Sequence, residues 1–368
     1  MIMKQRIIFT LTAVATLLSV SCRKADEYLP PDWNYAIPET TLASPAIVGA
    51  VYNIYTTADW KSVQGYEPEL CVVYDEQGVA TGSVPYTATQ DGIITAQCAL
   101  AKKAGIDFFL IPWNNGEVET NFVNAWDFYW TADSSVRLVI KYNFGHLHIT
   151  ELSSGGADFD AVVNDFKALY ATLFSKEWYY HLPSGKPVVV VSGMADEKID
   201  WEHFLAGFRE AMAGFARETG AAASALDFFF IGENTTNWAA PQTNESTARW
   251  LDANYVLNWY PTTYYERWAC FFPFTDMAWQ NWRDYAANWG NEFVPCIYPE
   301  AVYSGTKDRY IERTEKNYTD FCNVAKRNIG KSNLVMVNSW NDFSHDSALE
   351  PASPWGETYM DITRRELK

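Results

Sequence analysis

A short stretch near the carboxyl end of the chain, NSWNDFSHDSALE at residues 338–350, concentrates side chains that can do chemistry. It holds two aspartates, a histidine, two asparagines, a tryptophan and a glutamate. Carboxyl and imidazole groups can exchange protons with a reacting group, and amides can hydrogen bond to hydroxyl groups. The stretch follows residues 334–337, an apolar run typical of a strand that is buried on both faces. Such a strand end is typical of the carboxyl end of a parallel barrel, where active sites lie.

Seven further apolar runs with strand-like composition precede this one. They are residues 46–55, 106–112, 136–140, 188–191, 226–231, 255–257 and 293–297. Helical patterns separate most of them, at residues 91–104, 120–130, 159–178, 200–219, 277–289 and 309–328. Because strands that alternate with helices pair in parallel, eight such units predict an α/β fold, a (β/α)8 TIM barrel. A doubly wound open sheet is the alternative, but it would gather polar residues at one switch point and not after most strands.

Amides, carboxylates and aromatic rings follow most of these predicted strands. They are Trp113, Asn114, Tyr142, Glu233, Asn258, Trp259, Tyr260, Tyr298, Glu300, Trp340, Asn341 and Asp342. Amides and carboxylates form paired hydrogen bonds with neighbouring hydroxyl groups, and indole and phenol rings cover the apolar faces of sugars. We therefore predict a carbohydrate site, in which all of these residues except Glu300 and Asp342 bind substrate.

Glycoside hydrolysis generally needs one group that protonates the departing oxygen and another that acts as base or nucleophile. The candidates for these catalytic roles are Asp342, His345, Asp346 and Glu300. The alternative role for a carboxylate after a strand is to cap a loop. We expect this structural role for Glu350, which precedes a proline.

The segment WNDFSHDSALEP at residues 340–351 resembles the motif after the last barrel strand of glycoside hydrolase families 71 and 99 and of WbsX-like proteins. That motif is roughly W-N-E/D-W/Y-x-E-G-x-x-I/L-E-P. Residues 99–113 and 281–295 resemble two helix–strand units of family 99, and Arg313 and Tyr318 match an R and a Y before its last strand. The resemblance implies a (β/α)8 barrel that acts on α-linked glycans, as endo-α-mannosidases, endo-α-mannanases and α-1,3-glucanases do.

The resemblance also implies catalytic roles, because the family motif carries two catalytic acids three residues apart. The first matches Asp342. The second, which is the proton donor, falls on His345, and Asp346 stands where the family has glycine. An imidazole with an unperturbed pKa of about 6.5 is mostly neutral at pH 7 unless nearby carboxylates raise that pKa. Asp342 or Asp346 could do so, and Asp346 could itself replace the missing acid.

Two hypotheses about function follow from this departure. The first is a glycoside hydrolase for an α-linked glycan of the α-mannan or α-glucan type. The second is a glycan-binding protein on the same barrel that has lost catalysis and kept its oligo- or polysaccharide partner. A glycosyltransferase, as some WbsX-like proteins are described, fits poorly because an exported domain has no supply of nucleotide sugars.

Residues 1–22 have the pattern of a bacterial lipoprotein signal peptide. Lys4 and Arg6 precede an apolar run at residues 7–20 that is too short to remain in a bilayer, and Cys22 follows small residues. We predict that Cys22 is lipidated, an ordinary secretory signal being the alternative. Residues 23–45 are then a tether and residues 46–368 the barrel. This organisation predicts an exported lipoprotein of the cell envelope, attached to the outer membrane only through its lipid.

The composition excludes several other classes of function. The formal net charge of −17 argues against nucleic acid, which requires clustered Lys and Arg. The six cysteines have spacings that match neither a zinc site nor a disulfide framework, so we expect buried thiols beyond Cys22. His146 and His148 could form part of a metal site, but with no further histidine near them in sequence we predict no metal. We also predict no cofactor.

Overall fold

The computed structural model describes residues 35–63, 65–149, 151–192, 198–234, 240, 247–256, 271–302 and 309–368. Residues from Ile37 to Lys368 form one compact unit. Four predicted functional residues, Cys22, Asn258, Trp259 and Tyr260, lie outside the described residues.

The main sheet consists of parallel strands that close into a ring. Its strands are β1 (Ile47–Val51), β5 (Phe108–Trp113), β6 (Arg137–Tyr142), β7 (Val188–Val191), β8 (Phe229–Asn234), β9 (Ala253–Val256), β10 (Glu292–Val294), β11 (Cys296–Ile297) and β14 (Leu334–Val337). Only Pro295 separates β10 from β11. Because β10 pairs with β9 and β11 pairs with β14, this one interrupted strand joins the two edges of the sheet. The (β/α)8 barrel is confirmed, and the open sheet is excluded.

Side chains alternate between the two faces of the barrel strands, as strand geometry requires. In β5, Phe108 and Leu110 belong to the core inside the barrel, whereas Phe109 and Ile111 belong to the larger core between strands and helices. Gly49 in β1 makes room inside the barrel, since a Cβ there would lie 2.2 Å from the ring of Phe108. The parity of a residue in its strand therefore decides whether it faces the barrel axis.

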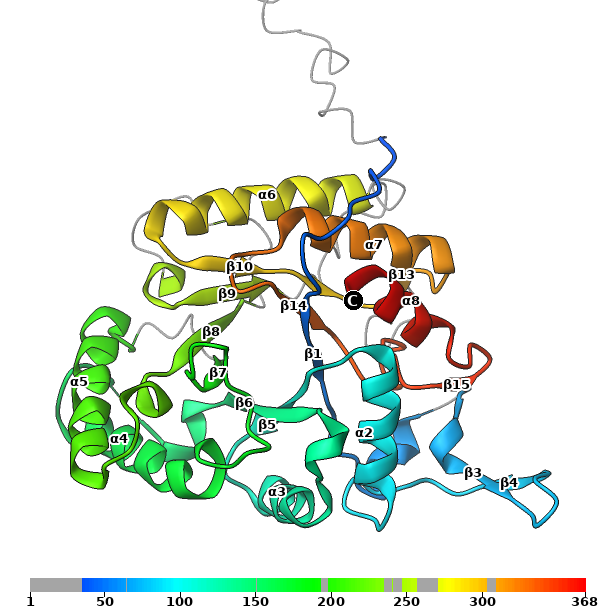
Figure 1. The fold of residues 1–368 in the computed structure, drawn as a ribbon, viewed down its shortest axis with the longest axis horizontal. Helices are drawn as coiled ribbons and strands as arrows, with labels where there is room; N and C mark the ends of the chain where they lie inside the picture. Colours follow the sequence, from blue (N-terminus) through cyan, green and yellow to red (C-terminus); the bar gives the residue numbers. More distant parts are fainter. Residues whose placement is uncertain are drawn as a thin grey trace, which may run out of the picture. The chain divides into compact units, whose positions relative to one another are not determined.

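Helices surround the ring of strands (Figure 1). They are α2 (Ile93–Ala104), α3 (Glu117–Tyr129), α4 (Ala157–Leu169), α5 (Trp201–Thr219), α6 (Phe271–Trp289), α7 (Glu315–Asn328) and α8 (Thr358–Leu367). Helix α8, which we did not predict, packs against both α7 and α2 and completes the outer layer. None of the helices in the described part of the chain is both long and apolar enough to cross a bilayer.

The start of the last long helix differs from the prediction. The segment Arg309–Ile311 is strand β13, which pairs with β12 (Ala301–Val302). Helix α7 begins only after Thr314, whose side chain accepts a hydrogen bond from the backbone N–H of Asn317 at 3.1 Å. A threonine in this position is a preferred N-cap because it satisfies an otherwise unpaired donor of the first turn.

The loops that follow the first and last barrel strands are joined at the carboxyl end of the barrel. The loop after β1 contains β2 (Glu67–Pro68) and the hairpin of β3 (Val72–Tyr74) and β4 (Ala80–Ser83). Strand β2 pairs with β15 (Ala352–Ser353), which follows the loop after β14. This pairing brings the first loop against residues 338–350, the stretch that the sequence singles out.

Candidate functional site

The loop after β14 is closed at its base by Trp340. The backbone N–H of Trp340 donates to the carbonyl of Val51 at 2.7 Å and so extends the contact between β14 and β1. The carbonyl of Trp340 accepts from the backbone N–H groups of Leu349 and Glu350 at 2.8 and 2.7 Å. These bonds hold the two ends of the loop together, so the intervening residues project as one compact turn at the barrel mouth.

Asp342 and His345 form an ion pair within this turn. Nδ1 of His345 lies 2.8 Å from Oδ2 of Asp342, and Oδ1 accepts from the Ser344 hydroxyl at 2.7 Å and from the backbone N–H of His345 at 3.2 Å. Burial alone would raise the pKa of Asp342, but its hydrogen bonds and the charge of His345 outweigh burial and lower it. The hydrogen bond to Asp342 raises the pKa of His345 above its usual value. The pair therefore favours imidazolium and carboxylate together.

Asp346 and Glu300 meet at Arg313, next to this turn. Nε of Arg313 lies 3.1 Å from Oε2 of Glu300, and its Nη2 donates to the backbone carbonyl of Asp346 at 2.7 Å. The guanidinium also lies 3.8 Å from the centre of the Trp355 ring. Glu300 and Arg313 are both buried, so the charge of Glu300 is compensated inside the protein.

Glu350 is fully buried behind the turn, and its position agrees with the structural role expected from the sequence. Its Oε2 accepts a hydrogen bond from the hydroxyl of Tyr86 at 2.8 Å, and the same hydroxyl accepts one from Nε2 of Gln97 at 3.1 Å. The indole N–H of Trp340 donates to Oε1 of Gln97. Burial raises the pKa of Glu350 to about 7. This hydrogen-bond network fixes the positions of Trp340 and Glu350 at the two ends of the turn.

Glu233 lies on a different part of the barrel mouth, at the end of β8. Ile231 of the same strand faces the barrel interior, and Glu233 has the same parity. Its carboxylate accepts from Nζ of Lys141 at 3.2 and 3.3 Å and from the hydroxyl of Tyr255. Lys141 near the end of β6 is partly exposed, whereas Glu233 is almost buried. The sequence prediction found Glu233 but missed Lys141, which lies within an apolar strand.

Four of the predicted substrate-binding rings lie elsewhere than expected. Trp113, Tyr142, Tyr298 and Trp340 are at most 4% exposed and belong to the core between strands and helices. The Tyr142 hydroxyl donates to Asp165 at 2.6 Å, and the Tyr298 ring packs against Phe321. Trp113 and Tyr142 have the strand parity that points away from the barrel axis, whereas Tyr298 and Trp340 lie beyond the ends of β11 and β14. In this structure all four support the site from behind and offer no exposed face to a sugar.

Two of the three predicted amides lie within the described residues, and their environments differ. Asn341 is buried and clamps the first loop, since its Oδ1 accepts from the backbone N–H of Asn53 at 2.7 Å and its Nδ2 donates to the carbonyl of the same residue at 3.0 Å. Asn114 is exposed and hydrogen bonds to Asn143 at 2.9 Å and Glu119 at 3.1 Å. Asn114 can therefore reach solvent, whereas Asn341 holds the loops together.

Trp60 and Tyr66 are partly exposed aromatic residues that the sequence prediction overlooked. The ring of Trp60 stacks on Tyr55 with centroids 4.5 Å apart, and Tyr55 in turn accepts a hydrogen bond from the backbone N–H of Phe343. The ring of Tyr66 packs against that of Trp355 with centroids 4.9 Å apart. Trp60 and Tyr66 belong to the first loop, in a region without a strand pattern. The only sequence signal that could have pointed to them is the high aromatic content of the chain.

His146 has two hydrogen-bond partners, and four of the cysteines are buried. The two ring nitrogens of His146 contact the carbonyl of Asn143 and the carboxylate of Asp165. Cys71, Cys98, Cys296 and Cys322 are buried free thiols, as predicted. Within the described ranges, no three His, Cys, Asp or Glu side chains are arranged to hold a metal ion.

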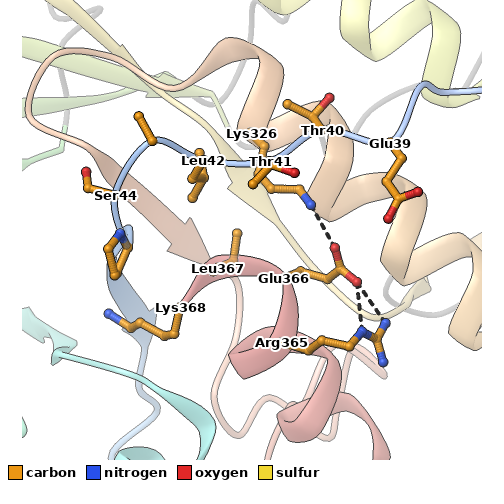
Figure 2. Close-up of a pocket in the computed structure, with 12 residues that line it drawn as sticks. Glu39, Thr40, Thr41, Leu42, Ser44, Lys326, Arg365, Glu366, Leu367 and Lys368 are labelled. Atoms are coloured by element: carbon orange, nitrogen blue, oxygen red, sulfur yellow. Dashed lines mark hydrogen bonds and ion pairs between the residues drawn. The ribbon is translucent and has the colours of Figure 1, made fainter.

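A pocket of about 400 Å³ lies at the opposite end of the barrel, between residues 39–45 and the end of α8 (Figure 2). Three cations line it, and each is paired. Glu366 binds Lys326 at 2.7 Å and Arg365 at 2.9 Å, and Lys368 binds Asp107 at 2.6 Å. Polar residues at the amino end of a barrel usually serve stability, and this pocket fits that description.

Comparison with known proteins supports the barrel assignment. No family model matches the sequence, and no curated protein matches it either. Among solved structures, a glycoside hydrolase-like protein aligns with a TM-score of 0.70 and 20% identity over 91% of this chain and 97% of its own. A GH99 endo-α-mannosidase from Bacteroides thetaiotaomicron aligns in two structures, with TM-scores of 0.56 and 0.54 and identities of 14% and 15%. These alignments cover 87% of this chain and 94% and 96% of the mannosidase chains.

The chain has the fold of a family 99 glycoside hydrolase. The resemblance inferred from residues 340–351 thus agrees with the three-dimensional comparison. At these identities the likeness concerns the fold, and the chemistry has to be argued from the residues of the barrel mouth.

Proposed function

We propose that this protein is a glycoside hydrolase that cuts an α-linked glycan of the α-mannan or α-glucan type. The observation that carries the proposal is the Asp342–His345 ion pair on the turn after the last strand of a glycosidase-type barrel. In that position the pair occupies the two places where the resembling family has its catalytic acids.

In this proposal His345 protonates the departing glycosidic oxygen. Asp342 orients the ring through Nδ1 and keeps it protonated, so that Nε2–H is the proton donor. The raised pKa of His345 supports this role, because an acid catalyst has to hold its proton at the working pH. Asp342 is then an orienting carboxylate, since three donors of its own turn already occupy its two oxygens.

The alternative is a glycan-binding protein without turnover. The specific observation in its favour is that two of the candidate acids are neutralised inside the protein, Asp342 by its turn and Glu300 by Arg313. Partly exposed rings such as Trp60 and Tyr66 and the exposed amide of Asn114 would serve binding in either case.

Turnover by the purified full-length protein decides between these functions. We expect α-mannan or α-1,3-glucan to release new reducing ends with the wild type. The Asp342→Asn variant should bind the same glycan and turn it over at least about 100-fold more slowly. Binding without release of reducing ends by the wild type would contradict hydrolysis and support the binding protein. A control variant, Asp361→Asn on the exposed face of α8, should retain wild-type turnover.

We further propose that the protein is exported and anchored through lipid at Cys22. Support comes from the basic, apolar and small-residue segments that precede this cysteine. Cells that express the protein with labelled palmitate should incorporate label into it, and the Cys22→Ala variant should not be labelled. An unlabelled wild-type protein recovered in the soluble fraction would contradict the anchor.

A further inference from the structure

We infer that Glu233 is the second catalytic residue of the barrel, the base that takes a proton from the attacking water, and that Lys141 positions its carboxylate. This inference rests on the proposed glycosidase function. It supplies the group that the turn after β14 lacks, because hydrolysis needs a proton acceptor in addition to the donor His345.

The first argument is one of position among the acidic candidates. Asp342 and Glu300 lie on loops beyond the ends of their strands, and Glu350 is fully buried behind the loop after β14. Of the five acidic residues that the sequence singled out at strand ends, Glu233 is the one that lies in a barrel strand with the parity of the interior face. Its carboxylate therefore stands at the carboxyl end of the barrel axis, where TIM-barrel enzymes bind their substrates.

The second argument is the way in which this carboxylate is held. Tyr255 lies on β9, the neighbour of β8 on one side, and Lys141 lies on β6, beyond β7 on the other side. Both side chains hydrogen bond to the Glu233 carboxylate, and all three residues lie near the ends of their strands. Side chains mounted on strands are more rigidly placed than those on loops. Lys141 retains 28% exposure, so the ion pair borders on solvent and is not sealed in the core.

The third argument is a buried donor on the same face. Asn338 follows Met336 at the end of β14 with interior parity, and its Nδ2 has no hydrogen-bond partner among the described residues although the residue is only 5% exposed. Buried amide groups normally have a partner. A sugar hydroxyl at the barrel mouth would supply one.

The reaction balances with these two groups. The bond between the anomeric carbon and the glycosidic oxygen breaks, and that oxygen takes the proton from Nε2 of His345. The oxygen of water forms the new bond to the anomeric carbon, and Glu233 takes the proton that this water loses. Proton exchange of both residues with solvent then restores the starting state, and the net change is addition of one water to one glycoside.

The experiment compares Glu233→Gln and Glu233→Ala with the wild type. We expect kcat to fall about 100- to 10,000-fold in both variants while glycan binding persists. Azide should restore turnover in Glu233→Ala by attacking the anomeric carbon directly, with a glycosyl azide as product. The matched control is Asp165→Asn, which removes another carboxylate bonded to a tyrosine hydroxyl, but on the helix side of the strands. It should show no such loss and no azide rescue.

A second variant keeps the inference testable if replacement of Glu233 prevents folding. Lys141→Met removes the side chain that positions the Glu233 carboxylate and should lower kcat more than about tenfold, whereas Lys141→Arg, which restores a cation there, should recover most of the loss. Turnover within about threefold of wild type in Lys141→Met would overturn the inference, as would the same result in folded Glu233→Gln. Failure of the wild type itself to cut any α-glycan would instead overturn the proposed function, and this inference with it.

Discussion

The hydroxyl of Tyr86 donates a hydrogen bond of 2.8 Å to the buried carboxylate of Glu350, a residue 264 positions further along the chain. This contact ties the loop after the first barrel strand to the turn after the last one. The geometry of the proposed catalytic pair therefore depends on a group that lies behind it and is out of reach of substrate.

Stability should depend on the ionisation of Glu350. Its folded-state pKa of about 7 lies above its usual value of 4.5, so between these pH values the folded protein holds a proton that the unfolded chain releases. The free energy of unfolding should therefore fall as pH rises from 4.5 to 7, by about 3 kcal/mol, and then level off. Glu350→Gln should remove this decline, whereas replacement of the exposed Glu117 by Gln should leave it unchanged. Urea unfolding at several pH values measures the free energy of unfolding. An equal fall of this free energy with pH in Glu350→Gln would show that Glu350 is not the group responsible.

The alkaline limb of activity should report the Asp342–His345 pair. Because the hydrogen bond to Asp342 raises the pKa of His345, Asp342→Asn should lower that pKa and shift the alkaline limb of kcat/KM to lower pH. The sign follows from the role of imidazolium as proton donor, which is lost as pH rises through its pKa. The measurement is a pH profile with soluble glycan. An alkaline limb at the same pH in Asp342→Asn and in the wild type would exclude His345 as the acid.

Replacement of His345 should affect substrates according to their leaving group. His345→Gln should slow turnover of a natural glycan about 100- to 10,000-fold, since a sugar hydroxyl needs protonation to depart. An aryl glycoside whose leaving group is a strongly acidic phenol needs little protonation to react. The variant should therefore lose much less activity on this substrate. Steady-state kinetics on both substrates make the comparison, and equal losses would show that His345 has another role.

Removal of Arg313 should destabilise the fold more than removal of its whole ion pair. Arg313→Met leaves the buried charge of Glu300 without its partner, which should cost about 3–5 kcal/mol in the free energy of unfolding. The double variant Arg313→Met/Glu300→Gln should recover part of this loss, because no buried charge remains. Chemical denaturation of the three proteins tests the expectation. A double variant less stable than Arg313→Met would contradict it.

The order of apolar and helical segments along the sequence was enough to predict the barrel. A buried parallel strand needs a continuous apolar segment, and eight such segments separated by helices leave few other topologies. The motif at residues 340–351 and the acid, imidazole and amide groups of its turn were also visible in sequence, because each depends on local spacing. The start of α7 was not predicted, since a short strand at Arg309–Ile311 is stabilised by its pairing with β12 and not by its own residues.

Only the tertiary structure decided which strand-end side chains face the barrel mouth. Trp113 and Tyr142 lie at the ends of their strands just as Glu233 does, but their parity turns them towards the helices. A one-residue difference in where a strand ends reverses the face. Lys141 becomes part of the site only because β6 and β8 lie on either side of β7 in the sheet. Trp60 and Tyr66 reach the site because the loop that contains them is held there by the pairing of β2 with β15. Local composition therefore determined the elements and the chemistry of the last turn. The partners of Glu233 and Glu350 depend on contacts between distant segments, which exist only when the barrel is closed.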